Sequence, residues 1–135
     1  MKRENQILGA EGEKLAENFL RKKGYLILAR NWKCKFGELD IVAARYEGKF
    51  LRKKRVIVFV EVKTIDMADA KFVGQAEQNV NYFKQKHLIS SAQCYLKAKC
   101  VSPETAWQID VIAIEFDAFG KQHKLRHLER AVWGS

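Results

Sequence analysis

The chain has 135 residues and carries 25 Lys and Arg against 16 Asp and Glu, a formal net charge of +9 at pH 7. Hydrophobic residues make up 47% of the chain, which is enough for one buried core and excludes global disorder. The length fits a single domain over residues 1–135. A strong positive charge favours a polyanionic partner, and nucleic acid is the commonest one.

Neither a membrane span nor a secretion signal is predicted. The longest apolar run, Val56 to Val60, is far shorter than the ~20 residues that a spanning helix needs. The basic N-terminus is not followed by the apolar region of a signal peptide. We therefore expect a cytoplasmic protein without membrane contacts. The cysteines Cys34, Cys94 and Cys100 are widely spaced and are expected to be reduced thiols rather than zinc ligands.

The first half of the chain predicts one helix followed by three strands. Apolar residues recur at helical spacing from Glu4 to Lys23, and Gly24 is typical of a helix end. A basic, turn-rich connection from Tyr46 to Arg55 precedes the strongest strand signal, which is rich in β-branched residues. The predicted strands are Tyr25 to Ala29, Gly37 to Ala44 and Val56 to Ile65.

The second half predicts a helix from Ala70 to Lys99, with room for a break near Lys86 to Ser90. A strand from Thr105 to Phe116 follows, then a turn over residues 117–120. The tail from Lys121 to Trp133 can add a final strand. The order α-β-β-β-α-β predicts an α/β (α+β) fold, in which a mixed β-sheet is flanked by helices.

A carboxylate and an ammonium group are predicted on one face of the third strand. Side chains alternate along a strand, so Glu61 and Lys63 share the face of Ile57 and Phe59, and the even-numbered valines take the other face. The two charged groups would emerge where the strand leaves the core. An ordinary ion pair at a strand end is the alternative interpretation.

Further carboxylates are predicted nearby. Glu38 and Asp40 share one face of the second strand, opposite Leu39, Ile41 and Ala43. If this strand pairs with the next, Asp40 lies beside Glu61, and a hard divalent cation would relieve the repulsion between them. Glu13 projects near the core-facing stripe of the first helix. An exposed acidic turn and a solvent-facing boundary Glu are the alternatives.

The ordered set of motifs resembles a known family. Asp40, followed 21 residues later by Glu61-Val62-Lys63, resembles the metal-and-lysine pattern of the PD-(D/E)XK nucleases, although Leu39 stands where that pattern has Pro. The wider series resembles the YraN-like family, which is similar to Holliday-junction-resolvase-type nucleases. The connection Lys49 to Arg55 is longer and more basic than is usual there. The series is Gly9-x-x-Gly12-Glu13, Gly24-Tyr25, Arg30-Asn31-Trp32, Gly37-Glu38-Leu39-Asp40, Val58-Phe59-Val60-Glu61-Val62-Lys63 and Ile109-Asp110-Val111.

This resemblance implies a restriction-endonuclease-like core and metal-dependent hydrolysis of phosphodiester bonds in DNA, including branched or damaged DNA. Asp40, Glu61 and the Val62 backbone carbonyl would hold Mg²⁺ or Mn²⁺, and Glu13 would complete the site. Lys63 would orient the attacking water or offset charge on the phosphate. For Glu38, a structural salt bridge is at least as good an interpretation as metal ligation. We expect a structural role for Asp110.

Basic residues away from the carboxylates are predicted to track phosphates. The residues concerned are Arg52, Lys53, Lys54, Arg55, Lys84 and Lys86, with a solvated surface as the alternative. The alternative function is a non-catalytic nucleic-acid-binding module, or an accessory protein, that retains the nuclease fold. The sequence leaves open DNA versus RNA, and it allows a homodimer without requiring one.

Overall fold

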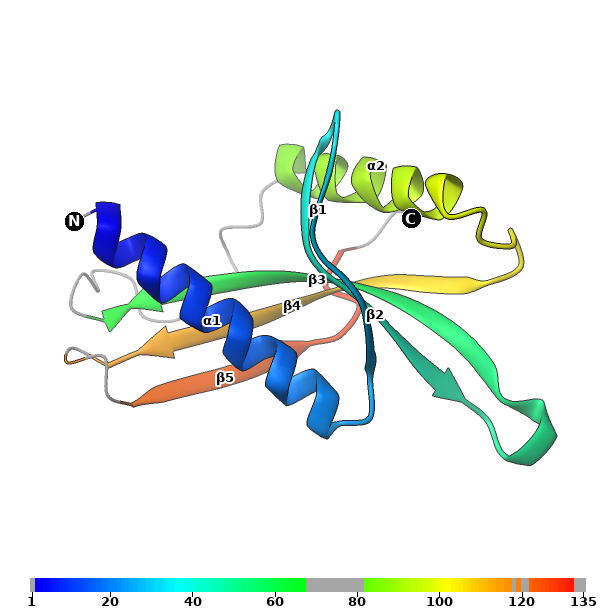
Figure 1. Ribbon diagram of the computed structural model, residues 1–135, viewed down its shortest axis with the longest axis horizontal. Coiled ribbons are helices and arrows are strands. Elements are labelled where there is room, and N and C mark those ends of the chain that lie inside the picture. Colours follow the sequence, from blue (N-terminus) through cyan, green and yellow to red (C-terminus); the bar gives the residue numbers. More distant parts are fainter. Residues whose placement is uncertain (1, 68–81, 118, 120–121, 133–135) are drawn as a thin grey trace.

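The computed structural model describes residues 2–67, 82–117, 119 and 122–132 (Figure 1). Its helices are α1 (Lys2–Lys22) and α2 (Tyr82–Ala98), with a short 3-10 helix η1 (Phe50–Arg52). The strands are β1 (Leu26–Cys34), β2 (Gly37–Glu47), β3 (Lys54–Asp66), β4 (Ala106–Phe116) and β5 (His123–Leu128). In these ranges neither helix combines the length and the apolar character needed to cross a bilayer.

The strands form one five-stranded mixed sheet in the order β1-β2-β3-β4-β5. The pairing of β3 with β4 is parallel and the other pairings are antiparallel. A parallel pair needs a crossover connection, and α2 lies on it. Figure 1 shows α1 on one face of the sheet and α2 on the other. The predicted α+β class and element order are confirmed, and the arrangement is consistent with a restriction-endonuclease-like core.

Two apolar cores lie on opposite faces of the sheet. The core on the α1 side contains Val56, Val58 and Val60, together with Ala16 and Leu20 of α1. The core on the α2 side contains Ile57 and Phe59, together with the α2 residues Leu88, Ala92 and Tyr95. The predicted alternation along β3 is therefore confirmed, because its odd and even residues enter different cores.

The prediction that Leu39, Ile41 and Ala43 share one face of β2 is wrong. Leu39 packs into the core on the α2 side, whereas Ile41 and Ala43 pack into the core on the α1 side. The paired register of β2 with β3 ends at Ile41 and Val60. Regular alternation is lost where β2 separates from β3, and Asp40 occupies that position.

Several elements extend further than the sequence predicts. β1 continues through Cys34 because it pairs with β2 along its whole length. β2 and β3 extend into the connection that was predicted as a basic loop, and η1 closes it. α2 is continuous where a break near Lys86 to Ser90 was allowed. The predicted helical residues 70–81 and Trp133 lie outside the described residues.

Candidate metal centre

The candidate site lies at the fork where β2 and β3 separate. The last paired residues are Ile41 and Val60. Asp40 directly precedes Ile41 in the chain, and Glu61 directly follows Val60. The Asp40 Oδ2 atom accepts a hydrogen bond of 2.8 Å from the Val62 backbone N–H. The Asp40 side chain therefore satisfies a donor at the point where the ladder between these strands ends.

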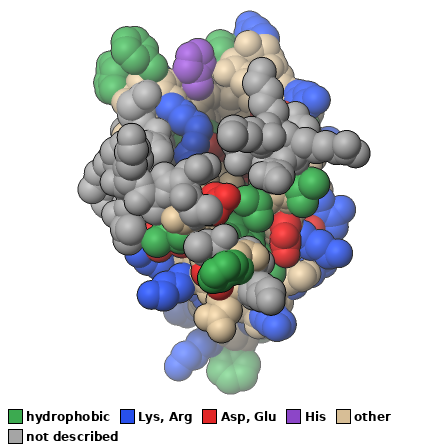
Figure 2. Space-filling view, turned by 90° about the vertical axis from the view of Figure 1, so that its left-hand side faces the viewer, with side chains coloured by type: hydrophobic (Ala, Val, Ile, Leu, Met, Phe, Trp, Pro, Cys, Tyr) green, Lys and Arg blue, Asp and Glu red, His purple; other side chains and the backbone are tan. Residues whose placement is uncertain are grey.

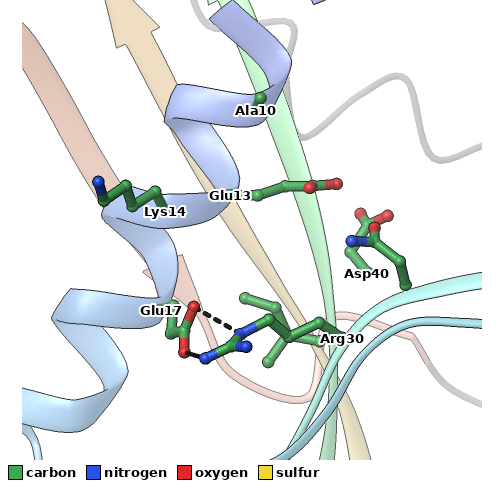
Figure 3. A pocket seen from close by; sticks show the side chains of 8 residues that line it. Ala10, Glu13, Lys14, Glu17, Arg30 and Asp40 are labelled. Carbon is green, nitrogen blue, oxygen red and sulfur yellow. Dashed lines mark hydrogen bonds and ion pairs between the residues drawn. The ribbon is translucent and has the colours of Figure 1, made fainter.

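Helix α1 brings Glu13 to this fork by an unusually close approach to the sheet. A Cβ atom placed on Gly12 would lie 2.2 Å from Cγ2 of Thr64 on β3, so this contact excludes a larger residue in the present packing. Glu13 and Asp40 both line a hollow of about 330 Å³. Figure 3 shows the Glu13 side chain reaching from α1 toward Asp40, with the ion pair between Glu17 and Arg30 beside them.

A second hollow, of about 340 Å³, opens on the α2 side of the same fork. Asp40 lines this hollow as well, together with Glu38, Glu61 and the α2 residue Lys84. The structure thus brings the predicted carboxylates Glu13, Glu38 and Glu61, from three elements, around Asp40.

The carboxylates repel one another in a partly buried setting. Burial, followed by the charge of Glu61, raises the pKa of Asp40 to about 8, against the opposing effect of the Val62 N–H bond. Burial, followed by the charges of Glu38 and Glu61, also raises the pKa of Glu13. Asp40 therefore holds its proton at a pH where an ordinary carboxylate is ionised.

Glu61 is stabilised by two lysines. Its Oε1 atom lies 3.3 Å from Nζ of Lys63 and 3.1 Å from Nζ of Lys84, and only 8% of the residue is exposed. Lys84 lies one helical turn before Leu88, on the stripe of α2 that also carries buried Ser91 and Tyr95. This helical spacing from Leu88 was the sequence signal that could have assigned Lys84 to the candidate site instead of to a phosphate-binding surface.

The donor set fits a hard divalent cation, because it consists of carboxylate oxygens whose repulsion such a cation would relieve. The carboxylate oxygens at the fork nevertheless lie further apart than in a compact metal site. Among the described residues, the one group of three potential ligands whose atoms all lie within 4.8 Å of one another is Asp110, His127 and Glu129.

Asp110 is saturated by hydrogen bonds in that second group. It is fully buried and accepts bonds from Gln108 (2.8 Å), His127 Nε2 (2.7 Å) and the Arg130 backbone N–H (2.9 Å). Lys23 Nζ lies 3.2 Å from His127 Nδ1, and an ammonium group only donates, so Nδ1 accepts and Nε2 carries the proton given to Asp110. This geometry is that of an anchor joining β4, β5 and the end of α1.

The other predicted residues lie away from the fork. Arg52, Lys53, Lys54 and Arg55 are all exposed in and beside the β2–β3 connection. Lys86 lies over the ring of Tyr82, at 4.9 Å from its centroid. On the described part of the face in Figure 2, acidic side chains lie toward the middle and Lys and Arg side chains lie mainly around them.

The comparisons with known proteins place the chain in a family. Residues 12–114 match the sequence profile of the uncharacterised protein family UPF0102. The chain is 37% identical over 125 residues to a UPF0102 protein of Roseiflexus castenholzii, covering 93% of this chain and 92% of that protein. It is 33% identical over 129 residues to one of Desulforamulus reducens, covering 96% and 98%. A UPF0102 protein of Chloroflexus aurantiacus is 39% identical over 107 residues, covering 79% and 78%. The YraN-like resemblance is thereby confirmed, and the chain belongs to the uncharacterised protein family UPF0102.

Proposed function

We propose that the protein is a metal-dependent nuclease that hydrolyses phosphodiester bonds in DNA. The observation that carries this proposal is the meeting of Glu13, Asp40 and Glu61, from three separate elements, at the fork between β2 and β3. A purely structural role would not need carboxylates from three elements at one point, where burial and neighbouring charges raise the pKa of Asp40 and Glu13.

Asp40 and Glu61 are the residues that would hold Mg²⁺ or Mn²⁺, with Glu13 entering from the α1 side. A bound divalent cation lowers the pKa of a water ligand and polarises a phosphate. Lys63 and Lys84 both form ion pairs with Glu61. A phosphate held by a cation on Glu61 would therefore lie near their ammonium groups, which would offset the charge that develops on it.

One observation favours the alternative of a non-catalytic binding module. The ion pairs of Lys63 and Lys84 compensate the charge of Glu61 without any metal. In that case the fork would be a stable structural feature, and the positive surface would bind nucleic acid without cleaving it.

Mn²⁺ titration calorimetry tests the metal site. We expect the wild type to bind the ion, and Glu61→Gln to weaken this binding at least about tenfold, because the variant removes a charged oxygen ligand. Glu104→Gln, an exposed carboxylate at the start of the β4 segment, is the matched control and should bind as the wild type does. Equal affinities for wild type and Glu61→Gln would contradict the assignment.

Cleavage of linear, flapped and four-way DNA with Mn²⁺ or Mg²⁺ tests the chemistry. Lys63→Ala should lose about 10²–10³-fold in cleavage rate, as removal of one charge-stabilising donor does elsewhere. It should keep its DNA affinity, because only one of 25 basic residues is lost. DNA binding by the wild type without cleavage of any of these substrates would favour the binding module.

A further inference from the structure

The β2–β3 connection forms an arm that leaves the body of the molecule. Pairing of β1 with β2 starts at Ala44, and pairing of β3 with β4 starts at Val56, so the two sides of the hairpin over residues 46–55 pair only with each other and no further strand flanks them. Every residue from Tyr46 to Arg55 is exposed. Figure 1 shows this arm at lower right, pointing away from both helices.

The tip of the arm presents two apolar side chains to solvent. Phe50 is 90% exposed and Leu51 is fully exposed. Phe50 also has a φ of +57°, which is an unfavourable backbone conformation for an aromatic residue. The strain and the exposure are not compensated by packing within the described residues, which indicates that the tip is shaped for a partner.

The turn itself is defined rather than loose. Gly48 has a φ of +100°, and a Cβ atom there would lie 2.4 Å from the Arg52 carbonyl oxygen. The Arg52 N–H donates to the Lys49 carbonyl oxygen at 3.2 Å. At the base of the arm, Arg45 donates to Gln108 (2.8 Å), which in turn donates to buried Asp110 (2.8 Å). The arm is therefore anchored to the sheet.

Charge identifies the partner. The exposed segment carries five cations around the apolar tip and one carboxylate, Glu47, which pairs with Arg45. Cationic flanks beside an apolar wedge suit a nucleic acid, where phosphates surround stacked bases and Phe or Leu side chains insert between base steps.

We propose that the Tyr46–Arg55 arm grips a nucleic acid and inserts Phe50 and Leu51 into its base stack. The inference rests on the proposed function in that one polymer reaches both the arm and the fork. The ladder from Ile41 at the fork to Glu47 spans six residues, or about 20 Å at ~3.3 Å per residue. The wedge residues Phe50 and Leu51 lie beyond Glu47, so at ~3.4 Å per base pair the wedge enters the duplex at least about six base pairs from the phosphate at the fork.

The experiment uses the full chain in EDTA, so that binding is measured without cleavage. Duplex and flapped DNA carry 2-aminopurine at successive positions, and affinity and fluorescence are recorded together. The wild type should raise the fluorescence at one position, which reports local unstacking. Phe50→Ala with Leu51→Ala should abolish that rise and weaken binding about tenfold, while the salt dependence and melting temperature stay unchanged.

The matched control is Phe119→Ala, another aromatic residue that is 84% exposed. It should behave as the wild type does. An unchanged fluorescence response in the tip variant would overturn the proposal, and so would an equal loss in the control. Tip-dependent binding to anionic vesicles, or tip-dependent self-association in sedimentation, without any effect on DNA would also overturn it. Because no divalent cation is present, a failed nuclease assignment and a failed arm assignment give different results.

Discussion

Opposing influences act on the ionisation of Asp40. Its carboxylate accepts the Val62 N–H bond, which favours the ionised form. Burial and the neighbouring carboxylates favour the protonated form and dominate, which raises its pKa to about 8. A buried carboxylate with so strongly raised a pKa is typical of a functional site, where a protein loses some stability in order to position reactive groups.

Asp40→Asn is therefore expected to stabilise the metal-free protein at alkaline pH. The pKa of Asp40 is raised on folding, so between pH ~4 and ~8 the folded chain holds a proton that the unfolded chain releases, and the free energy of unfolding falls as pH rises. Asn keeps an oxygen for the Val62 N–H but carries no charge. Urea unfolding in EDTA should show a gain of about 1–3 kcal/mol at pH 8.5 and almost none at pH 4.

Two controls accompany this measurement. Glu104→Gln lies outside the site and should leave the pH dependence of unfolding as it is in the wild type. Mn²⁺ should stabilise the wild type at pH 8.5 more than Asp40→Asn, since the ion binds the ionised carboxylate that the Asn variant lacks. A wild-type stability that does not fall between pH 4 and pH 8 would show that Asp40 titrates normally.

At this scale the sequence predicts part of the site. The positions of Asp40 and Glu61 on two adjacent strands were enough to expect them close together, and both line one hollow, although the strand pairing ends just before them. The position of Lys84 at Glu61 depends on the docking of α2 against the sheet, which a single-sequence pattern does not define. Its spacing to Leu88 carried that information only once the helix face was known.

Among the elements, α1 determines whether Glu13 can reach the fork. Gly12 permits the contact with β3, and a methyl group there would overlap Thr64 Cγ2 at 2.2 Å. Without Cγ2, the remaining neighbours would lie at 3.6 Å and 3.8 Å, which are ordinary contacts. The packing of α1 against β3 therefore depends on the missing Cβ atom at position 12 and on the position of the Thr64 methyl group.

Gly12→Ala is expected to destabilise the fold by about 1–3 kcal/mol, as overpacking does. Thr64→Ser removes Cγ2 and should restore most of that loss in the double variant, which a double-mutant cycle of unfolding free energies would detect as coupling. Gly9→Ala is the control, because its Cβ meets nothing within 4 Å and should add helix stability. Additive effects of Gly12→Ala and Thr64→Ser would contradict the close contact.

The sequence predicts the elements better than their departures from regularity. Apolar periodicity was sufficient for α1 and for the β-branched core of β3. The separation of β2 from β3 at Ile41 and Val60 is a tertiary event, and it placed Leu39 in a different core from Ile41. The arm was mistaken for a loop, because charged residues at a projecting hairpin show no core-facing alternation.

In the whole molecule, charges of opposite sign lie in different places. The carboxylates gather at the fork, whereas the arm, about 20 Å along the ladder by the strand rise, carries five cations. The net charge of +9 would attract a polyanion over the surface, and the acidic fork alone would repel it. A divalent cation at the fork would remove that repulsion at the point where a phosphate must approach.

This separation predicts that the arm determines the salt dependence of nucleic-acid binding. Each phosphate contact contributes about 0.9 to the slope of log affinity against log salt on duplex DNA. Replacing Arg52, Lys53 and Lys54 by Ala should make the slope shallower by about 2–3. Replacing Lys22, Lys97 and Lys99, exposed at the ends of the helices, lowers the net charge equally from +9 to +6. Fluorescence anisotropy in EDTA should find the wild-type slope in this control, and equal slopes for the two triple variants would show that net charge, not the arm, governs binding.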